Sequence, residues 1–354
     1  MKRILSFALA FLIFCSLASC QENHSSDIED TVLGESEEGV EFLEDSTDKA
    51  YMRNGNKILL GYYPQSEVAD DMLRERLCNI AGELPTSSNP QSWTSYGYYI
   101  SGSVSDYMWY IDVEDGSDRY RGVYFTSYRP YYTTSSSSAE NTYQDDNGYL
   151  INSVYWFKYE PISWTLLSEN KSDGTAFIYC DMIIDSREYY ITDGSIRNIN
   201  GEAIYPNNYA HSTIREWLNE CFFDIAFDDR EKEIILASTV ENRDESTGYG
   251  NNPYACENTC DKVLLLSYGE AIKSNYGLNS TELRQKISSD YARAQGAYTD
   301  TSSRYVGNSQ WWLRSPYIPY MMGFSCYVNY QGIGVYRSVN STDLGIAPAL
   351  NIIL

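Results

Sequence analysis

Two cysteines, Cys256 and Cys260, form the one close pair among the six thiols that follow Cys20. They lie in a turn-rich loop after Pro253. Thiols at this spacing can staple a loop as a disulfide, and an oxidising compartment favours that outcome. Cysteine also behaves as a small apolar core residue, so two buried free thiols are the alternative. The sequence marks Cys256 and Cys260 as a candidate disulfide and leaves both interpretations open.

Histidine, the usual general base, is almost missing, because the chain contains only His24 and His211. His211 stands just before a predicted helix start, and no Gly-x-Ser-x-Gly motif accompanies it. A histidine-based triad is therefore not expected. Two histidines are also too few for a zinc site built from several of them. We assign no catalytic, cofactor-binding or metal-binding residue.

Carboxylates are plentiful, but the sequence gives no separation between them, so a glycosidase pair cannot be chosen. Two Asp-rich pieces, Asp145-Asp146-Asn147-Gly148 and Asp228-Asp229, contain oxygen ligands that suit calcium. Neither follows the pattern of an EF-hand loop, and turn or helix-cap chemistry is enough to explain both. Calcium binding remains an open alternative.

The run Trp311-Trp312-Leu313-Arg314-Ser315-Pro316 combines two indoles with a guanidinium. In an extended strand successive side chains alternate, so Trp311 and Leu313 share one face, and Trp312 and Arg314 share the other. We assign the first face to the core. We expect the second face to cover another layer or to line a groove, with Arg314 stacked on an aromatic ring or paired with a carboxylate. A structural role for the run is favoured.

The loop after this run, Tyr317-Ile318-Pro319-Tyr320-Met321-Met322, is the best candidate for ligand contact. Solubility does not explain tyrosine and methionine in a proline-braced loop. Aromatic faces suit sugar rings or partner proteins. The candidate ligand-binding residues are Trp312, Arg314, Tyr317 and Tyr320.

Several elements must position these residues. Residues 161–167 have strand character, and Ser212 is expected to cap a helix over residues 214–223. Asp228 or Asp229 is expected to open a second short helix. The predicted core consists of Trp164, Trp217, Leu218, Trp311 and Leu313.

The preceding part of the chain is also rich in strand signals. Residues 57–63 read as a strand that Pro64 ends, and Ser66 is expected to cap a helix that runs to Ile80. Residues 107–125 read as a hairpin whose turn is supplied by Asp115-Gly116.

The start of the chain has the layout of an export signal. Two basic residues precede an apolar stretch, residues 4–14, that is too short to span a bilayer. Leu17-Ala18-Ser19-Cys20 resembles the lipobox of a bacterial lipoprotein, in which Cys20 would carry the lipid. We predict a signal peptide over residues 1–19, lipidation of Cys20, and a place in the cell envelope, lipid-anchored outside the cytoplasm. A secretory signal that happens to contain a cysteine is the alternative.

Charge and composition indicate which classes of partner to expect. Residues 21–48 contain many acids and no Lys or Arg, so residues 20–50 are expected to form a disordered acidic tether. The formal net charge of −23 repels phosphate backbones, and we expect no nucleic-acid partner. The 34 tyrosines suit half-buried strands and wet binding surfaces.

Five ordered motifs lie in the C-terminal part of the chain: residues 159–164, 212–219, 289–294, 311–316 and 345–354. Together they resemble a known family of bacterial extracytoplasmic domains, DUF6273, whose function is unknown. That family is distantly similar to the C-type-lectin-like and sulfatase-modifying-factor folds. The resemblance implies an α+β fold: one C-type-lectin-like domain of twisted antiparallel sheets and short helices over residues 161–354, with residues 51–160 as a β-rich N-terminal elaboration. Ala347 stands where the family usually has arginine.

The lipobox, the acidic tether and the tyrosine-rich loops favour a cell-surface lipoprotein that binds a glycan or an envelope protein without catalysis. One alternative comes from the related fold, in which formylglycine-generating oxidases use a copper-binding cysteine pair; Cys256 and Cys260 are the comparable pair here. The Arg-Gly-Gly-Ser-Trp signature of those enzymes is absent. The other alternative is a purely structural envelope protein. Ligand identity, cysteine pairing and oligomeric state stay open.

Overall fold

The computed structural model describes residues 50–86, 88–95, 108–126, 148–191, 194–248, 250–272, 276–318 and 321–354. These residues belong to one compact unit, residues 41–354. The predicted signal peptide, Cys20 and the tether up to residue 49 lie outside the described residues. So do Tyr320 and the Asp145-Asp146-Asn147 piece.

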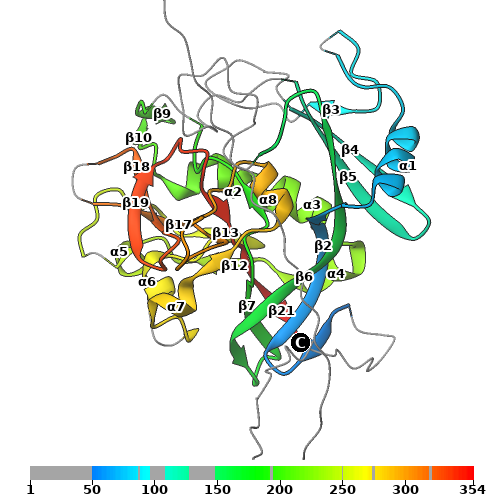
Figure 1. Cartoon of the computed structure of the whole chain (residues 1–354). Helices are drawn as coiled ribbons and strands as arrows, with labels where there is room; N and C mark the ends of the chain where they lie inside the picture. The colour runs from blue at the N-terminus through cyan, green and yellow to red at the C-terminus, as the bar shows by residue number, and fades with distance from the viewer. Residues whose placement is uncertain are drawn as a thin grey trace, which may run out of the picture. The chain divides into compact units, whose positions relative to one another are not determined.

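The larger sheet follows the order β11-β21-β7-β6-β5-β4-β3, and β1, β2 and β14 pair beside this path. Every pair in it is antiparallel. The long strand β6 pairs with β2, β5 and β7, so it joins the N-terminal strands to the C-terminal ones (Figure 1). The bounds are β1 (Met52–Asn54), β2 (Lys57–Glu67), β3 (Thr94–Ser95), β4 (Met108–Asp115), β5 (Asp118–Phe125), β6 (Val154–Asn170), β7 (Thr175–Cys180), β11 (Ile235–Leu236), β14 (Val263–Leu264) and β21 (Ala349–Ile353).

A second sheet has the order β19-β18-β17-β20-β8. Its pairs are antiparallel except β17 with β20, which is parallel. Its bounds are β8 (Asp185–Ser186), β17 (Trp311–Pro316), β18 (Phe324–Val328), β19 (Gly334–Ser338) and β20 (Gly345–Ile346). Three two-stranded ribbons complete the described strands: β9 (Arg197–Ile199) with β10 (Glu202–Ile204), β12 (Ser238–Val240) with β13 (Thr259–Asp261), and β15 (Lys286–Ile287) with β16 (Asn308–Ser309).

The helices are short, and most connect strands of the two sheets. They are α1 (Asp71–Ala81), the 3-10 turn η1 (Tyr209–His211), α2 (Thr213–Trp217), the π-helical turn η2 (Leu218–Phe222), α3 (Phe223–Ala226), α4 (Asp229–Ile234), α5 (Asp244–Thr247), α6 (Tyr268–Ile272), α7 (Thr281–Arg284) and α8 (Asp290–Ala294). The predicted α+β fold of antiparallel sheets with short helices is confirmed.

Two local predictions in the N-terminal part are wrong. Pro64 does not end the first strand, because β2 continues to Glu67 through an irregular register with β6 that tolerates the missing N–H. The helix begins after Asp70 rather than after Ser66. The Asp70 carboxylate accepts hydrogen bonds from the backbone of Met72 and Leu73, whereas the Ser66 hydroxyl donates to Glu160.

Three other local predictions are confirmed. β4 and β5 form the expected hairpin, and Gly116 takes the positive φ of +68° that its tight turn requires. The Ser212 side chain accepts a hydrogen bond from the Arg215 N–H at the start of α2. Asp228 caps α4 in a capping box with Glu231.

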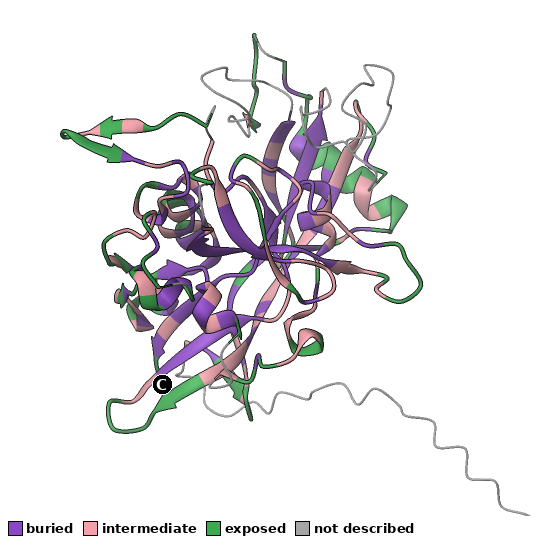
Figure 2. Cartoon of the chain, turned by 90° about the vertical axis from the view of Figure 1, so that its left-hand side faces the viewer, coloured by how far each residue is buried: buried purple, intermediate pink, exposed green. Residues whose placement is uncertain are grey.

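The interior is strongly aromatic. All five residues predicted for the core, Trp164, Trp217, Leu218, Trp311 and Leu313, are buried in one large cluster that joins both sheets. A smaller cluster lies under α1. Figure 2 shows the buried strands in the middle of the unit, and the exposed β9–β10 ribbon projects from it.

Candidate functional site

β17 is covered on both faces, so Trp312 does not line a surface groove. Trp311 and Trp312 are both fully buried. The Trp311 ring lies 5.6 Å from Tyr179, and the Trp312 ring lies 5.6 Å from Tyr189. The two indole N–H groups donate to backbone carbonyls at 3.2 and 2.9 Å. Trp312 therefore belongs to the core, which corrects its assignment as a ligand-binding residue.

Arg314 is also buried, and it holds the second sheet to the loops around α6. Its Nη1 and Nη2 donate to the two oxygens of Glu270 at 2.5 and 3.0 Å. The same two nitrogens donate to the carbonyls of Leu265 and Glu241, and Nε donates to Asn242. Arg314 pairs with a carboxylate inside the protein and has no surface left for a ligand, so its assignment as a binding residue is also corrected.

Tyr317 is the one predicted ligand residue that the structure places near the surface. It is half-buried and stacks on Tyr336 of β19, with ring centroids 3.8 Å apart and an interplanar angle of 18°. Tyr336 is 41% exposed, and the Phe324 ring meets its edge at 5.9 Å. Met321 and Met322 beside this stack are 38% and 37% exposed. We call Tyr317, Met321, Met322, Phe324 and Tyr336 the aromatic surface.

The predicted disulfide is absent, because Cys256 and Cys260 are both free thiols. Cys260 lies in β13 opposite Thr239 and is exposed. Cys256 is half-buried, and its burial raises the pKa of the thiol. Pairing between β12 and β13 fixes the backbone of Cys260, whereas Cys256 packs toward the core. The two thiols therefore stay apart although they are close in sequence.

A pocket that the sequence did not predict lies at the turn of the β18–β19 hairpin, against α7. Its volume is about 340 Å³. Gly332 makes the close approach possible: its φ is +81°, and a Cβ at this position would come within 1.8 Å of the Thr281 carbonyl oxygen. Arg284 fixes the turn by donating to the Gly332 carbonyl at 2.8 Å. We call this the hairpin pocket, and its lining residues are Thr281, Glu282, Gln285, Arg304, Tyr305, Gln331 and Ile333.

The hairpin pocket combines an aromatic ring with planar polar groups. Tyr305 packs on Tyr330 with ring centroids 5.7 Å apart, and the Arg304 guanidinium lies 5.2 Å from the Tyr305 ring. Gln285 donates to the Gln331 carbonyl at 3.3 Å, so the Gln285 side chain and the Gln331 backbone are held at the wall. Because the pocket is assembled from segments far apart in the chain, no local motif in the sequence marks it.

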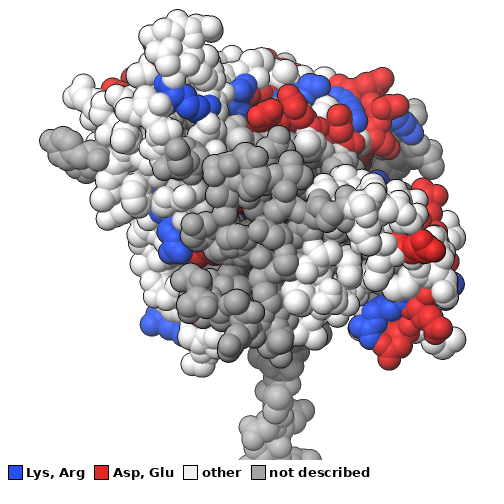
Figure 3. Space-filling model, turned by 90° about the horizontal axis from the view of Figure 1, so that it is seen from above, with Lys and Arg blue, Asp and Glu red and all other residues white. Residues whose placement is uncertain are grey.

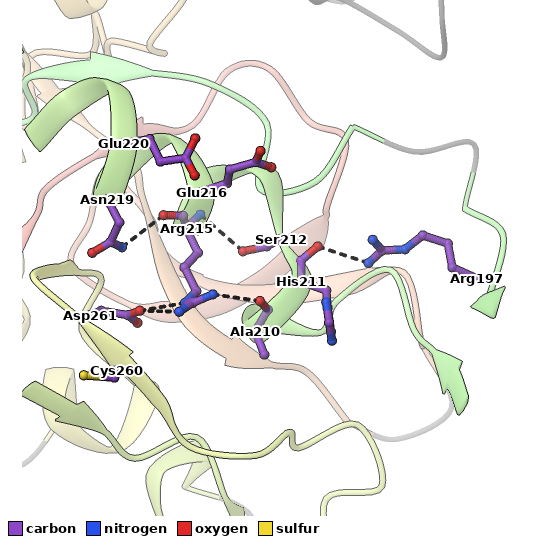
Figure 4. Close-up of a pocket in the computed structure, with 10 residues that line it drawn as sticks. All are labelled: Arg197, Ala210, His211, Ser212, Arg215, Glu216, Asn219, Glu220, Cys260 and Asp261. Carbon is purple, nitrogen blue, oxygen red and sulfur yellow. Dashed lines mark hydrogen bonds and ion pairs between the residues drawn. The ribbon is translucent and has the colours of Figure 1, made fainter. Parts of the chain in front are cut away.

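A second pocket, of about 380 Å³, lies between the β9–β10 ribbon, the helix formed by α2 and η2, and β13 (Figure 4). Its floor is an ion pair in which Arg215 donates from Nε to the fully buried carboxylate of Asp261 at 2.7 Å. Arg215 also donates to the Ala210 carbonyl at 2.9 Å. We call this the polar pocket, and its lining residues are Arg197, Ala210, His211, Ser212, Arg215, Glu216, Asn219, Glu220, Cys260 and Asp261.

The polar pocket brings His211 and Cys260 to one place without making them a catalytic pair. The His211 side chain is exposed; its partial desolvation and the nearby Arg197 and Arg215 lower its pKa. No hydrogen bond joins the imidazole to the Cys260 thiol, and Figure 4 shows the two groups pointing in different directions. Among the described residues, no group of three or more His, Cys, Asp and Glu side chains is placed to hold a metal ion.

The fold and these pockets define an α+β protein with antiparallel sheets and two polar surface cavities. Residues 173–354, just over half of the chain, match the family described as "Domain of unknown function (DUF6273)", and the chain belongs to this family. Comparisons with curated proteins and with solved structures gave no match. In the described part of the chain, no helix is long and apolar enough to cross a membrane.

Proposed function

We propose that this protein is a non-catalytic binding protein of the cell envelope, anchored through a lipid on Cys20, and that its ligand is a glycan bound at the hairpin pocket. The observation that carries the proposal is the composition of that pocket. One tyrosine ring stands beside two amide side chains, a guanidinium and a carboxylate in a cavity of about 340 Å³.

This composition matches the chemistry of a sugar ring. The apolar C–H face of a sugar can pack on the flat face of Tyr305, which offers a large contact at low conformational cost. Sugar hydroxyls both donate and accept hydrogen bonds, and Gln331, Glu282 and Arg304 supply both kinds of partner. Few polar groups with a fixed orientation are what gives a small pocket its specificity.

The direct test measures polysaccharide binding by the purified protein on a glycan array, followed by titration of the best ligand. Tyr305→Ala and Gln331→Ala should each weaken binding about tenfold, which corresponds to roughly 1.4 kcal/mol. Tyr62→Ala is the matched control, because Tyr62 is 52% exposed on β2 and does not line the hairpin pocket. A blank array, or equal binding by Tyr305→Ala and wild type, would refute the proposal.

The lipid anchor and a C-type-lectin-like arrangement of the family part belong to the same proposal, and each has its own test. Cys20→Ala should abolish labelling by a fatty-acid analogue. Labelling equal to that of wild type would contradict the lipid anchor. We also propose that the family part has a C-type-lectin-like arrangement, for which an experimental structure that superposes on a lectin domain is the required support.

A second candidate function is recognition of an envelope protein through the aromatic surface. The observation that favours it is the exposure of Met321, Met322 and Tyr336 in one place, because methionine and tyrosine are enriched at protein interfaces. Figure 3 shows acidic and basic side chains interspersed on the face it presents, and such a face does not favour nucleic acid. Crosslinking in envelope extracts should capture one partner with wild type and lose it with Tyr336→Ser, whereas Tyr305→Ala should keep it.

A further inference from the structure

The polar pocket carries opposite charges on different walls. Arg197 lies on the ribbon side, and Glu216 and Glu220 lie on the helix side (Figure 4). Arg215 between them is neutralised by Asp261, at 2.6 Å from its Nη2. The charges that remain for a ligand are therefore a guanidinium at one end and two carboxylates at the other.

Arg197 has donor capacity to spare. Its Nη2 donates to the His211 carbonyl at 3.1 Å, and its guanidinium lies 4.0 Å from the Tyr190 ring, so the side chain is held in place. Its Nε is buried and has no hydrogen-bond partner within the described structure. A buried donor without a partner costs free energy, and a carboxylate that draws the guanidinium toward the pocket would recover part of that cost.

The two glutamates are placed without a compensating cation. Glu216 and Glu220 are four residues apart and exposed, and no hydrogen bond or ion pair within the described part of the chain involves their carboxylates. Like charges at this spacing destabilise a helix. Glu220 also lies in the π-helical turn η2, a distortion that is frequent at functional sites.

The helix wall of the polar pocket is held in place before any ligand arrives. Asn219 donates to the carbonyls of Arg215 and Val263, and its Oδ1 accepts from the backbone of Lys262 and Val263. These bonds join the helix to β14. A wall that is already ordered loses little entropy on binding, which helps the pocket to hold a small ligand.

We propose that the polar pocket binds a small zwitterion, an amino acid or a short peptide, with its ammonium at Glu216 and Glu220 and its carboxylate at Arg197. The pocket volume of about 380 Å³ suits a ligand of this size. This site is separate from the hairpin pocket, and the proposal does not depend on glycan binding.

The experiment compares three forms of one probe on the full chain: alanyl-alanine, its N-acetyl derivative and its C-terminal amide. Binding is measured by calorimetry and by protection of Cys260, which lines the pocket, against alkylation. Cys78 and Cys221 are exposed thiols that do not line it and serve as internal controls. Only the unmodified dipeptide should bind strongly and protect Cys260, and each blocked form should bind at least about tenfold more weakly.

Charge-neutral variants test which residues bind the ammonium and which bind the carboxylate of the ligand. Glu216→Gln with Glu220→Gln should erase the preference for a free amine while keeping the preference for a free carboxylate, and Arg197→Gln should do the reverse. Glu245→Gln, at an exposed acid of α5, should change neither. Equal affinities for the three probe forms, or no binding of the dipeptide to wild type at millimolar concentration, would overturn the proposal. Glycan binding unchanged in these variants would leave the hairpin pocket proposal standing.

Discussion

The substitution Arg314→Met tests whether the ion pair between Arg314 of β17 and Glu270 of α6 stabilises the fold. Arg314 is fully buried and makes hydrogen bonds to the carboxylate of Glu270, to the carbonyls of Leu265 and Glu241, and to Asn242. Methionine has a similar length and fills most of the same space. It removes the charge and every donor, so Glu270 would be left without its cation.

The magnitude follows from the environment of Glu270. Removing one partner of a buried ion pair costs about 3–5 kcal/mol, mainly because the other charge stays buried without compensation. The Glu270 side chain is 22% exposed, so water relieves part of this cost and the lower value, about 3 kcal/mol, is expected. The midpoint of thermal unfolding should fall by roughly 6 °C.

The stabilisation by Arg314 should also depend on pH. Burial opposes ionisation of Glu270, but Arg314 and the hydrogen bonds from Ser267 outweigh it and hold the pKa of Glu270 below its ordinary value. A depressed folded-state pKa stabilises the protein above the unfolded pKa, and this contribution is lost as pH falls through the folded pKa. The difference between wild type and Arg314→Met should therefore be largest above about pH 5 and shrink in acid.

Urea unfolding followed by tryptophan fluorescence, with circular dichroism as a second probe, measures both effects. The double variant Arg314→Met with Glu270→Met removes both charges and should recover at least half of the lost stability, because a buried pair can often be replaced by apolar residues at little cost. A loss below about 1 kcal/mol for Arg314→Met, or a double variant as unstable as the single one, would show that the Arg314–Glu270 ion pair does not stabilise the fold in this way.

Three further predictions concern other parts of the fold. Tyr63→Phe removes the hydroxyl that donates to the fully buried Asp185 at 2.5 Å and should cost about 1–3 kcal/mol in urea unfolding; an unchanged unfolding midpoint would contradict it. Gly332→Ala should unfold the hairpin pocket's turn and cost at least about 2 kcal/mol. Gly307 also has a positive φ, but a Cβ there would make only an ordinary contact with Ile287 Cγ2 at 3.8 Å, so Gly307→Ala should cost about 1 kcal/mol; equal losses would show that the close approach is unimportant. Burial lowers the pKa of Lys286 to about 8, so between that pH and the ordinary value of 10.5 the unfolded chain binds more protons than the folded chain. The free energy of unfolding of wild type should therefore rise by up to roughly 3 kcal/mol relative to that of Lys286→Met across this range. Parallel stability curves would exclude the shift.

The sequence by itself determined the elements whose signals are local. The Asp115-Gly116 turn, the Ser212 cap and the Asp228 capping box each depend on a few neighbouring residues, so composition and spacing were enough. The burial of the residues predicted for the core was also predictable from residue type alone, because large apolar side chains gain most from leaving water. Where a better local partner competed, as Asp70 did with Ser66, the helix was predictable from the sequence but its first residue was not.

Only the tertiary structure decided which polar side chains face water. Arg314 is buried because Glu270, 44 residues away in the chain, supplies its counter-charge, and alternation along one strand cannot reveal that partner. Tyr305 and Gln331 become neighbours in a pocket because the hairpin turn packs on α7 through Gly332. Arg197 and Glu216 face the same cavity for a similar reason. Sites assembled from distant segments depend on long-range packing, and the periodicity of a single sequence contains no measure of it.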